Sequence, residues 1–169
     1  MSPADEADRT PEKSARTSAL DEVVDLVSAL IRFDTSNTGE LETTKGEKEC
    51  AEWVAHKLAE VGYETEYVES GAPGRGNVFA TLAGADPARG TLLIHGHLDV
   101  VPAEPADWSV HPFSGAVEDG YVWGRGAVDM KNMVAMSAMV IKVLARHPEI
   151  PRHRDLIFAA VADEDVVDN

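Results

Sequence analysis

Two stretches in the first third of the chain carry apolar residues at the spacing of an amphipathic helix. Apolar positions that recur every three or four residues predict a helix over about 19–33, with Ser18 as its N-terminal cap. A second helix is predicted to open at the capping-box pattern of Thr44 and Glu47 and to end at Gly62, a residue type favoured just past a helix C-terminus. Each helix is expected to bury one face in a core.

Shorter apolar runs farther along the chain have the alternation or the length of strands. They predict strands over 63–68, 77–82, 91–102 and 156–161. Asp119-Gly120, between alternating apolar residues, predicts a tight hairpin. The stretch 133–144 is apolar almost all round, which predicts a buried helix with its methionines in the core. Helices interleaved with strands predict an α/β fold with a mixed, mainly parallel sheet flanked by helices.

The strand predicted over 91–102 carries polar groups in the middle of its apolar run. His95, His97 and Asp99 are two positions apart, so the alternation of a strand directs all three side chains to one side. A charge in apolar surroundings is costly unless it is paired or bound to a metal. At this point two interpretations remain: a hydrogen bond between histidine and aspartate that caps the strand, or a metal site.

Carboxylates also stand where other predicted elements begin or end. Asp129 follows a glycine-rich turn and precedes the predicted buried helix, so it is either a helix cap or a ligand. Glu164 and Asp165 follow the last predicted strand. Sheets of α/β proteins bind ligands at the carboxyl ends of their strands, so the site is expected at that edge.

Composition and charge narrow the classes of function. The 169 residues fit one domain, and 44% hydrophobic content is that of an ordinary globular protein. A net charge of −15 repels phosphate backbones and anionic lipid, which argues against nucleic-acid and membrane partners. The one cysteine, Cys50, has no partner for an internal disulfide and falls on the apolar face of the second helix. It is expected to be a core residue of a cytoplasmic protein.

The N-terminal segment has a different character from the rest of the chain. Residues 1–17 are polar and acidic, and they lack the apolar core of a secretory signal. They are predicted to form a disordered acidic tail, which leaves 18–169 as the folded domain.

Five segments, taken together, resemble a known family of zinc-dependent hydrolases. They are Leu93-Ile-His-Gly-His-Leu-Asp-Val-Val-Pro102, Trp108 with Pro112-Phe113, the Asp119-Gly120 hairpin, Gly124-Arg-Gly-Ala-Val-Asp-Met-Lys131 and Ala162-Asp-Glu-Asp165. The first and fourth are the specific ones. The chain resembles metallopeptidase family twenty, which includes aminoacylases, acetylornithine deacetylases, succinyl-diaminopimelate desuccinylases, carboxypeptidases and dipeptidases. The resemblance implies that 18–169 is part of a di-zinc exopeptidase-like catalytic domain.

The family pattern, carried over residue by residue, implies a role for each polar group. His97 would be a ligand of one zinc ion, and Asp99 would orient its ring. Asp129 would bridge two zinc ions, for which Co²⁺ or Mn²⁺ are possible substitutes. Glu164 would be the general base that takes a proton from the attacking water.

Two positions stand apart from that pattern. The family usually has a glutamate after the general base as a ligand of the second metal, and this chain has Asp165, which is one methylene shorter. His95 matches a residue that lies beside the ligand and is expected to be structural.

The implied activity is hydrolysis of an amide bond in a small peptide or N-acyl amino acid by a metal-activated water. The competing hypothesis is a truncated, non-catalytic fragment or a metal-binding remnant. It is motivated by the family's further acidic ligand, C-terminal histidine and lid or dimerisation domain, which are not found in 18–169. In the complete enzyme a homodimer is possible, and the choice among dipeptide, acyl and succinyl substrates stays open.

Overall fold

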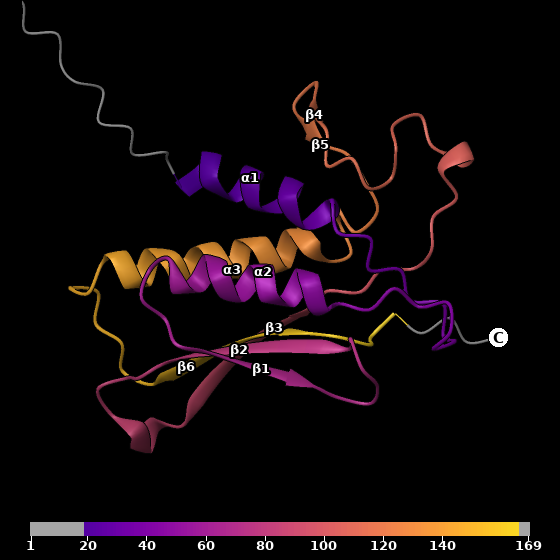
Figure 1. Cartoon of the computed structure of the whole chain (residues 1–169). Coiled ribbons are helices and arrows are strands. Elements are labelled where there is room, and N and C mark those ends of the chain that lie inside the picture. Colours follow the sequence, from indigo (N-terminus) through magenta and orange to yellow (C-terminus); the bar gives the residue numbers. More distant parts are fainter. Residues whose placement is uncertain (1–18, 166–169) are drawn as a thin grey trace, which may run out of the picture.

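One four-stranded sheet and three α-helices make up most of the part of the chain that the structure, a computed structural model, describes, residues 19–165 (Figure 1). The predicted tail over 1–17 and the predicted cap Ser18 lie outside the described residues. The helices are α1 (Ala19–Ile31), α2 (Lys48–Ala59), α3 (Lys131–Arg146) and the short 3₁₀ turns η1 (Pro87–Arg89) and η2 (Pro105–Asp107). The strands are β1 (Thr65–Glu69), β2 (Gly76–Leu82), β3 (Thr91–His97), β4 (Val117–Glu118), β5 (Tyr121–Val122) and β6 (Asp155–Val161).

The helices form two layers over one face of the sheet (Figure 1). Helix α2 packs on β1 and β2, helix α3 packs on β3 and β6, and α1 packs on α3. Each buries an apolar stripe, such as Leu30 and Ile31 of α1 and Val54 and Leu58 of α2, because water is excluded between the layers. Cys50 belongs to this core, as predicted. None of the helices within residues 19–165 is both long and apolar enough to cross a membrane.

The sheet is mixed, with strand order β1-β2-β6-β3. This confirms the expected α/β fold. Among the described strands, however, β3 and β6 are the one parallel pair, while β1–β2 and β2–β6 are antiparallel, so the sheet is less parallel than the sequence predicted. The short loop 70–75 permits only an antiparallel return, whereas β3 reaches β6 through a long crossover that contains α3. The parallel pair places His97 opposite Val161, so both strands end at the same edge.

The start of α2 differs from the predicted capping box. Glu47 precedes the helix, but no side chain caps the helix there. Thr44 instead donates a hydrogen bond to the side-chain oxygen of Asn37 at 3.3 Å. The free N–H groups of Glu47 and Lys48 donate to the carbonyl of Gly74 at 2.9 and 3.0 Å, so a neighbouring loop satisfies them. The Glu47 side chain is thereby left for another role.

Helix α3 is less enclosed than its sequence predicts. Its inner face, including Ala135 and Ile141, is fully buried. Met133 and Met136, predicted to be core residues, are 45% and 43% exposed, and Val140 is 51% exposed. Among the described elements, α1, α2 and the sheet contact α3, and the side of α3 that carries these three residues stays exposed.

Two lysines of α3 are buried at junctions between helices. Lys142 pairs with Glu22 of α1 at 2.5 Å and with Glu60, just after α2, at 3.4 Å. Lys131 donates hydrogen bonds to the carbonyls of Leu30 at 3.0 Å and Phe33 at 2.8 Å, at the end of α1. These contacts satisfy carbonyls and charges that would be costly to bury alone.

Candidate metal centre

The candidate site lies where β3 and β6 end. His97 is the last residue of β3, and the turn over 162–165 follows β6. The N–H of Leu98 donates to the carbonyl of Val161 at 2.7 Å, so the parallel pairing continues up to the turn. Asp129 approaches from the turn that precedes α3. Three segments that are far apart in the sequence therefore meet at one edge of the sheet, as the sequence predicted.

His97 is buried and is surrounded by carboxylates. Its Nε2 lies 3.2 Å from Asp129 Oδ1 and 3.5 Å from Glu164 Oε2. Its Nδ1 lies 3.8 Å from Asp165 Oδ2 and 3.5 Å from Asp99 Oδ1. One ligand atom from each of His97, Asp129 and Asp165 falls in a cluster whose members are all within 4.8 Å of one another.

The histidine ring is oriented by Asp99, but through a different atom from the one expected. The hydrogen-bond partner of His97 Nδ1 is the backbone carbonyl of Asp99 at 3.0 Å, and the carboxylate lies farther away. A carbonyl can only accept, so Nδ1 carries a proton, and Nε2 is the ring nitrogen that faces Asp129 and Glu164. Nε2 is therefore the nitrogen that would bind a cation after losing its own proton.

The Asp99 carboxylate holds the turn that follows β6. It accepts hydrogen bonds from the backbone N–H of Glu164 at 3.0 Å, from the N–H of Asp165 at 2.8 Å and from Asn37 Nδ2 at 3.0 Å. Burial of Asp99 opposes its ionisation, but His97 and these donors lower its pKa to about 2. Asp99 is therefore an anion that fixes the backbone of two predicted functional residues.

The charges in the cluster do not balance. The Asp99 carboxylate stabilises the protonated form of His97, with help from the Asp99 carbonyl and Asp165. Their effect outweighs that of burial, which lowers the pKa, so the pKa of His97 is raised to about 9. Burial, together with the neighbouring carboxylates of Asp99, Asp129 and Glu164, raises the pKa of Asp165. One imidazolium cannot neutralise this many carboxylates. A donor set of one imidazole nitrogen and several carboxylate oxygens suits a divalent zinc, cobalt or manganese ion.

Some residues near the site differ from the sequence picture or were missed by it. His95 is exposed and lies outside the cluster of His97, Asp129 and Asp165. Asn37 and Arg75 could not be identified as site residues from the sequence, although Arg75 contacts the Asp163 carboxylate in the same turn. Asn37 follows a run of turn-forming residues, but its partners lie 62 and 126 positions away. Contacts over such separations leave no local pattern to read.

Known proteins match the chain both in sequence and in fold. Residues 93–168 match the model of Peptidase family M20/M25/M40. A succinyl-diaminopimelate desuccinylase of Methylorubrum populi is 40% identical over 127 residues, covering 72% of this chain and 30% of the relative. The N-fatty-acyl-amino acid synthase/hydrolase PM20D1 of Bos taurus is 33% identical over 104 residues, covering 62% and 20%.

Solved structures share the arrangement of helices and strands. An M20 family metallo-carboxypeptidase, Sso-CP2 from Sulfolobus solfataricus, aligns with a TM-score of 0.70 at 23% identity, covering 86% of this chain and 31% of its own. Human carnosine dipeptidase 1 aligns with a TM-score of 0.69 at 24% identity, covering 86% and 32%. The chain spans about a third of the length of the curated desuccinylases that it matches. By its motifs, its fold and these matches, the chain belongs to Peptidase family M20/M25/M40.

Proposed function

We propose that the protein is a metal-dependent hydrolase of amide bonds in small peptides or N-acyl amino acids, and that this chain supplies part of its active site. The observation that carries the proposal is the convergence of His97, Asp129 and Asp165 within 4.8 Å, with the Glu164 carboxylate 3.5 Å from the same imidazole. The names of the similar proteins, a desuccinylase and an acyl-amino acid hydrolase among them, support this class of substrate.

Each residue of the cluster has a distinct task in the proposal. His97 Nε2 and Asp129 would hold one divalent cation, and Asp129 and Asp165 would hold a second. When bound, such ions lower the pKa of a water molecule toward neutrality and polarise the carbonyl of the scissile amide. The Asp99 carbonyl holds the proton on His97 Nδ1 and so keeps Nε2 available. Glu164 Oε2 would take the proton of the attacking water and return it to the leaving amine nitrogen.

A second candidate function is metal binding without turnover by the chain as given. Under the family pattern, the three clustered residues among those described would be shared between two ions, with His97 and Asp129 for the first and Asp129 and Asp165 for the second. Catalytic zinc sites normally hold about three protein ligands and a water. Each ion is thus one ligand short unless another group, such as one from a partner chain, completes it.

Zinc titration and an amidase assay on the same variants separate these functions. We would measure binding by calorimetry, and product amine with dipeptides and with N-acetyl and N-succinyl amino acids. His97→Ala should lose zinc, while the matched variant His95→Ala, on the same strand but outside the cluster, should keep it. Binding without turnover supports the second candidate, and turnover above the His97→Ala background supports a complete site. Equal zinc affinity in the wild type and in His97→Ala would contradict both.

A further inference from the structure

The turn that carries Glu164 and Asp165 contains a residue in an unusual backbone conformation. Asp163 has a φ of 68°, in the left-handed region that residues with a Cβ rarely occupy. Aspartate and asparagine tolerate that region better than most residues, but something must still hold it there. The conformation matters because Asp163 immediately precedes the proposed general base.

Two side chains from other segments bind the Asp163 carboxylate. Arg75 Nη2 contacts Asp163 Oδ1, and Asn37 Nδ2 donates to the same oxygen at 3.2 Å. Asn37 Nδ2 also donates to Asp99 Oδ2 at 3.0 Å. Asp99 holds the turn by accepting hydrogen bonds from its backbone N–H groups, and Asp163 holds it through its own side chain. The side-chain amide of Asn37 therefore links the two carboxylates.

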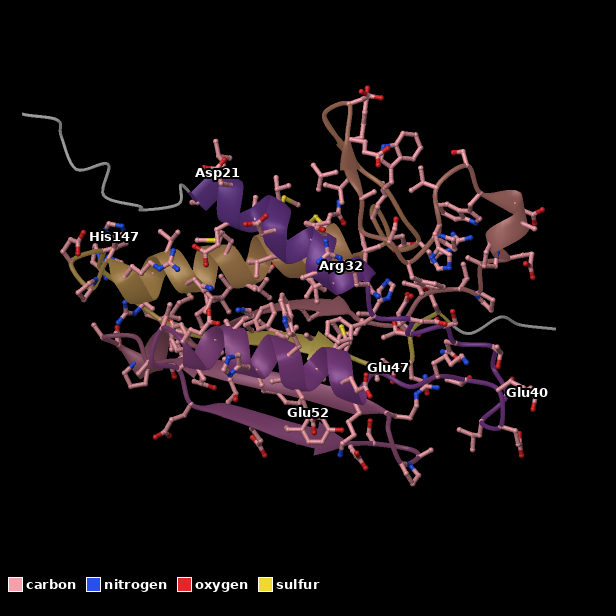
Figure 2. All side chains as sticks on the ribbon, turned by 45° about the horizontal axis from the view of Figure 1, so that its top comes forward. Asp21, Arg32, Glu40, Glu47, Glu52 and His147 are labelled. Carbon is pink, nitrogen blue, oxygen red and sulfur yellow. The ribbon has the colours of Figure 1, made fainter. Side chains whose placement is uncertain are left out.

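Arg75 is held in turn by a buried carboxylate. Its Nε lies 3.2 Å from Glu47 Oε2, and the two side chains are 6% and 0% exposed. Within residues 19–165, neither oxygen of Glu47 accepts a hydrogen bond, so this contact is an ion pair only. Glu47 lies at the start of α2 (Figure 2) and Arg75 lies on the loop between β1 and β2. Neither element contributes a proposed metal ligand.

A purely structural interpretation is that Arg75 only neutralises buried Glu47. That interpretation does not account for the second contact of Arg75. The side chain of Asp163 is 59% exposed and could be solvated by water without any ion pair. What the contact adds is a fixed position for the carboxylate, and thereby for the backbone, of the residue next to Glu164.

We propose that Arg75, held by Glu47, is a positioning residue that locks Asp163 in its left-handed turn and so directs Glu164 and Asp165 toward His97. The roles of Glu164 and Asp165 rest on the proposed function, whereas the locking of the turn does not. Partners that orient metal ligands and catalytic groups commonly contribute about 10- to 100-fold to metal affinity or activity.

Two substitutions remove the contact from opposite sides. Arg75→Gln removes the guanidinium, and Asp163→Gly removes the carboxylate while allowing the same positive φ. Arg75→Gln leaves Glu47 buried without its cation, so Glu47→Gln/Arg75→Gln is made alongside it to preserve the fold. The matched control is Arg89→Gln. Arg89 lies on η1, away from the site, and the substitution breaks its exposed ion pair with Asp86, the residue before η1.

The first readout is amide hydrogen exchange of the metal-free chain. In Arg75→Gln and in Asp163→Gly, the amides of Glu164 and Asp165 should exchange at least about tenfold faster, because their bonds to Asp99 open more often. The amides of Ala159 and Ala160 in β6 should be unchanged. The control should behave as the wild type at all four positions.

The second readout is zinc affinity by calorimetry. Arg75→Gln and Asp163→Gly should each lower the zinc affinity by about 10- to 100-fold. The double variant Arg75→Gln/Asp163→Gly should lose no more than the worse single one, because both substitutions act through one contact. Unchanged exchange at Glu164 and Asp165, or equal acceleration throughout β6, would overturn the proposal. If Arg75→Gln does not fold, Asp163→Gly decides by the same criteria.

The outcomes also separate this proposal from the proposed function. A wild-type chain that binds no zinc contradicts the metal site, yet the exchange measurement still tests the turn. A chain that binds zinc equally well in all variants, with unchanged exchange, keeps the metal site and removes Arg75 from it.

Discussion

His97 is the residue on which the candidate site depends, because its two ring nitrogens have different neighbours. The Asp99 carbonyl occupies Nδ1, and Asp129 and Glu164 face Nε2. This asymmetry identifies Nε2 as the ring nitrogen that faces the carboxylates and would bind a cation. A carboxylate that faces the same nitrogen from another segment should therefore be as important for metal binding as the histidine.

Asp129→Ala tests this expectation. We expect its zinc affinity to fall by at least about tenfold, because the variant loses the carboxylate closest to Nε2. The control is Asp107→Ala, which removes an exposed aspartate from η2. Calorimetric titration at one pH and one salt concentration gives both affinities. Equal values for the two variants would remove Asp129 from the metal centre.

Glu164 is predicted to act on protons and not to hold the metal. In an active, complete form of the enzyme, Glu164→Gln should keep its zinc and lose a factor of roughly 10² to 10⁴ in kcat, since an amide cannot accept the proton. Metal content is measured by elemental analysis and kcat by product release. A variant that turns over normally, or that loses its zinc, would show that the role is wrong.

Residues of the candidate site could be predicted from the sequence only where an ionisable side chain lies at the end of a predicted strand or in a turn next to a predicted helix. His97, Asp129 and Glu164 were predicted in this way, and the structure places their side chains together. Arg75 and Glu47 were not, because the pattern around Glu47 is typical of a helix cap, whereas burial and a distant arginine decide its actual environment. A carboxylate that is isolated in sequence does not reveal its partner.

At the scale of elements, Glu22 joins α1 to α3. Arg146 donates two hydrogen bonds to it, at 2.7 and 3.0 Å, and Lys142 contacts it at 2.5 Å. The hydrogen bond from Arg146, opposed by some desolvation and aided by Lys142, lowers the pKa of Glu22 to about 2. The folded state therefore favours the ionised carboxylate more than the unfolded state does.

The sign of the resulting pH dependence follows directly. The contribution of Glu22 to stability is complete above the unfolded pKa of about 4.5 and is lost as the pH falls from 4.5 to about 2. After solvent screening we expect about 1–2 kcal/mol. Denaturant unfolding gives the free energy of unfolding at pH 7 and at pH 3. Its decrease between the two pH values should be smaller for Glu22→Gln than for the wild type. Exposed Glu64→Gln is the control and should follow the wild type.

At the scale of the whole molecule, β3 forms one edge of the sheet. No strand among the described residues pairs with its outer side, and Leu92 and Leu93 on it are 45% and 55% exposed. An uncovered edge with apolar side chains is a surface on which another strand can add.

The isolated chain should therefore self-associate. We expect sedimentation velocity at micromolar concentration to show dimers or larger species, and Leu93→Lys to shift them toward monomer, because charge on an edge strand opposes pairing. Leu20→Lys alters an equally apolar and more exposed leucine on α1 and should have no such effect. A wild-type chain that is monomeric throughout this range would contradict the expectation.

The parallel pairing of β3 and β6 also has a consequence for the order of folding. The bonds from the Glu164 and Asp165 amides to Asp99 span 65 and 66 positions, so their formation closes a long loop whose entropy must be lost first. Local helices are expected to form early, and the candidate metal centre is expected to assemble only after this non-local step. Zinc at one hundred times its dissociation constant should then raise the unfolding free energy by about 2.7 kcal/mol, provided that it binds only the folded chain. The gain should appear mainly as slower unfolding, because a contact made after the transition state leaves the folding rate almost unchanged.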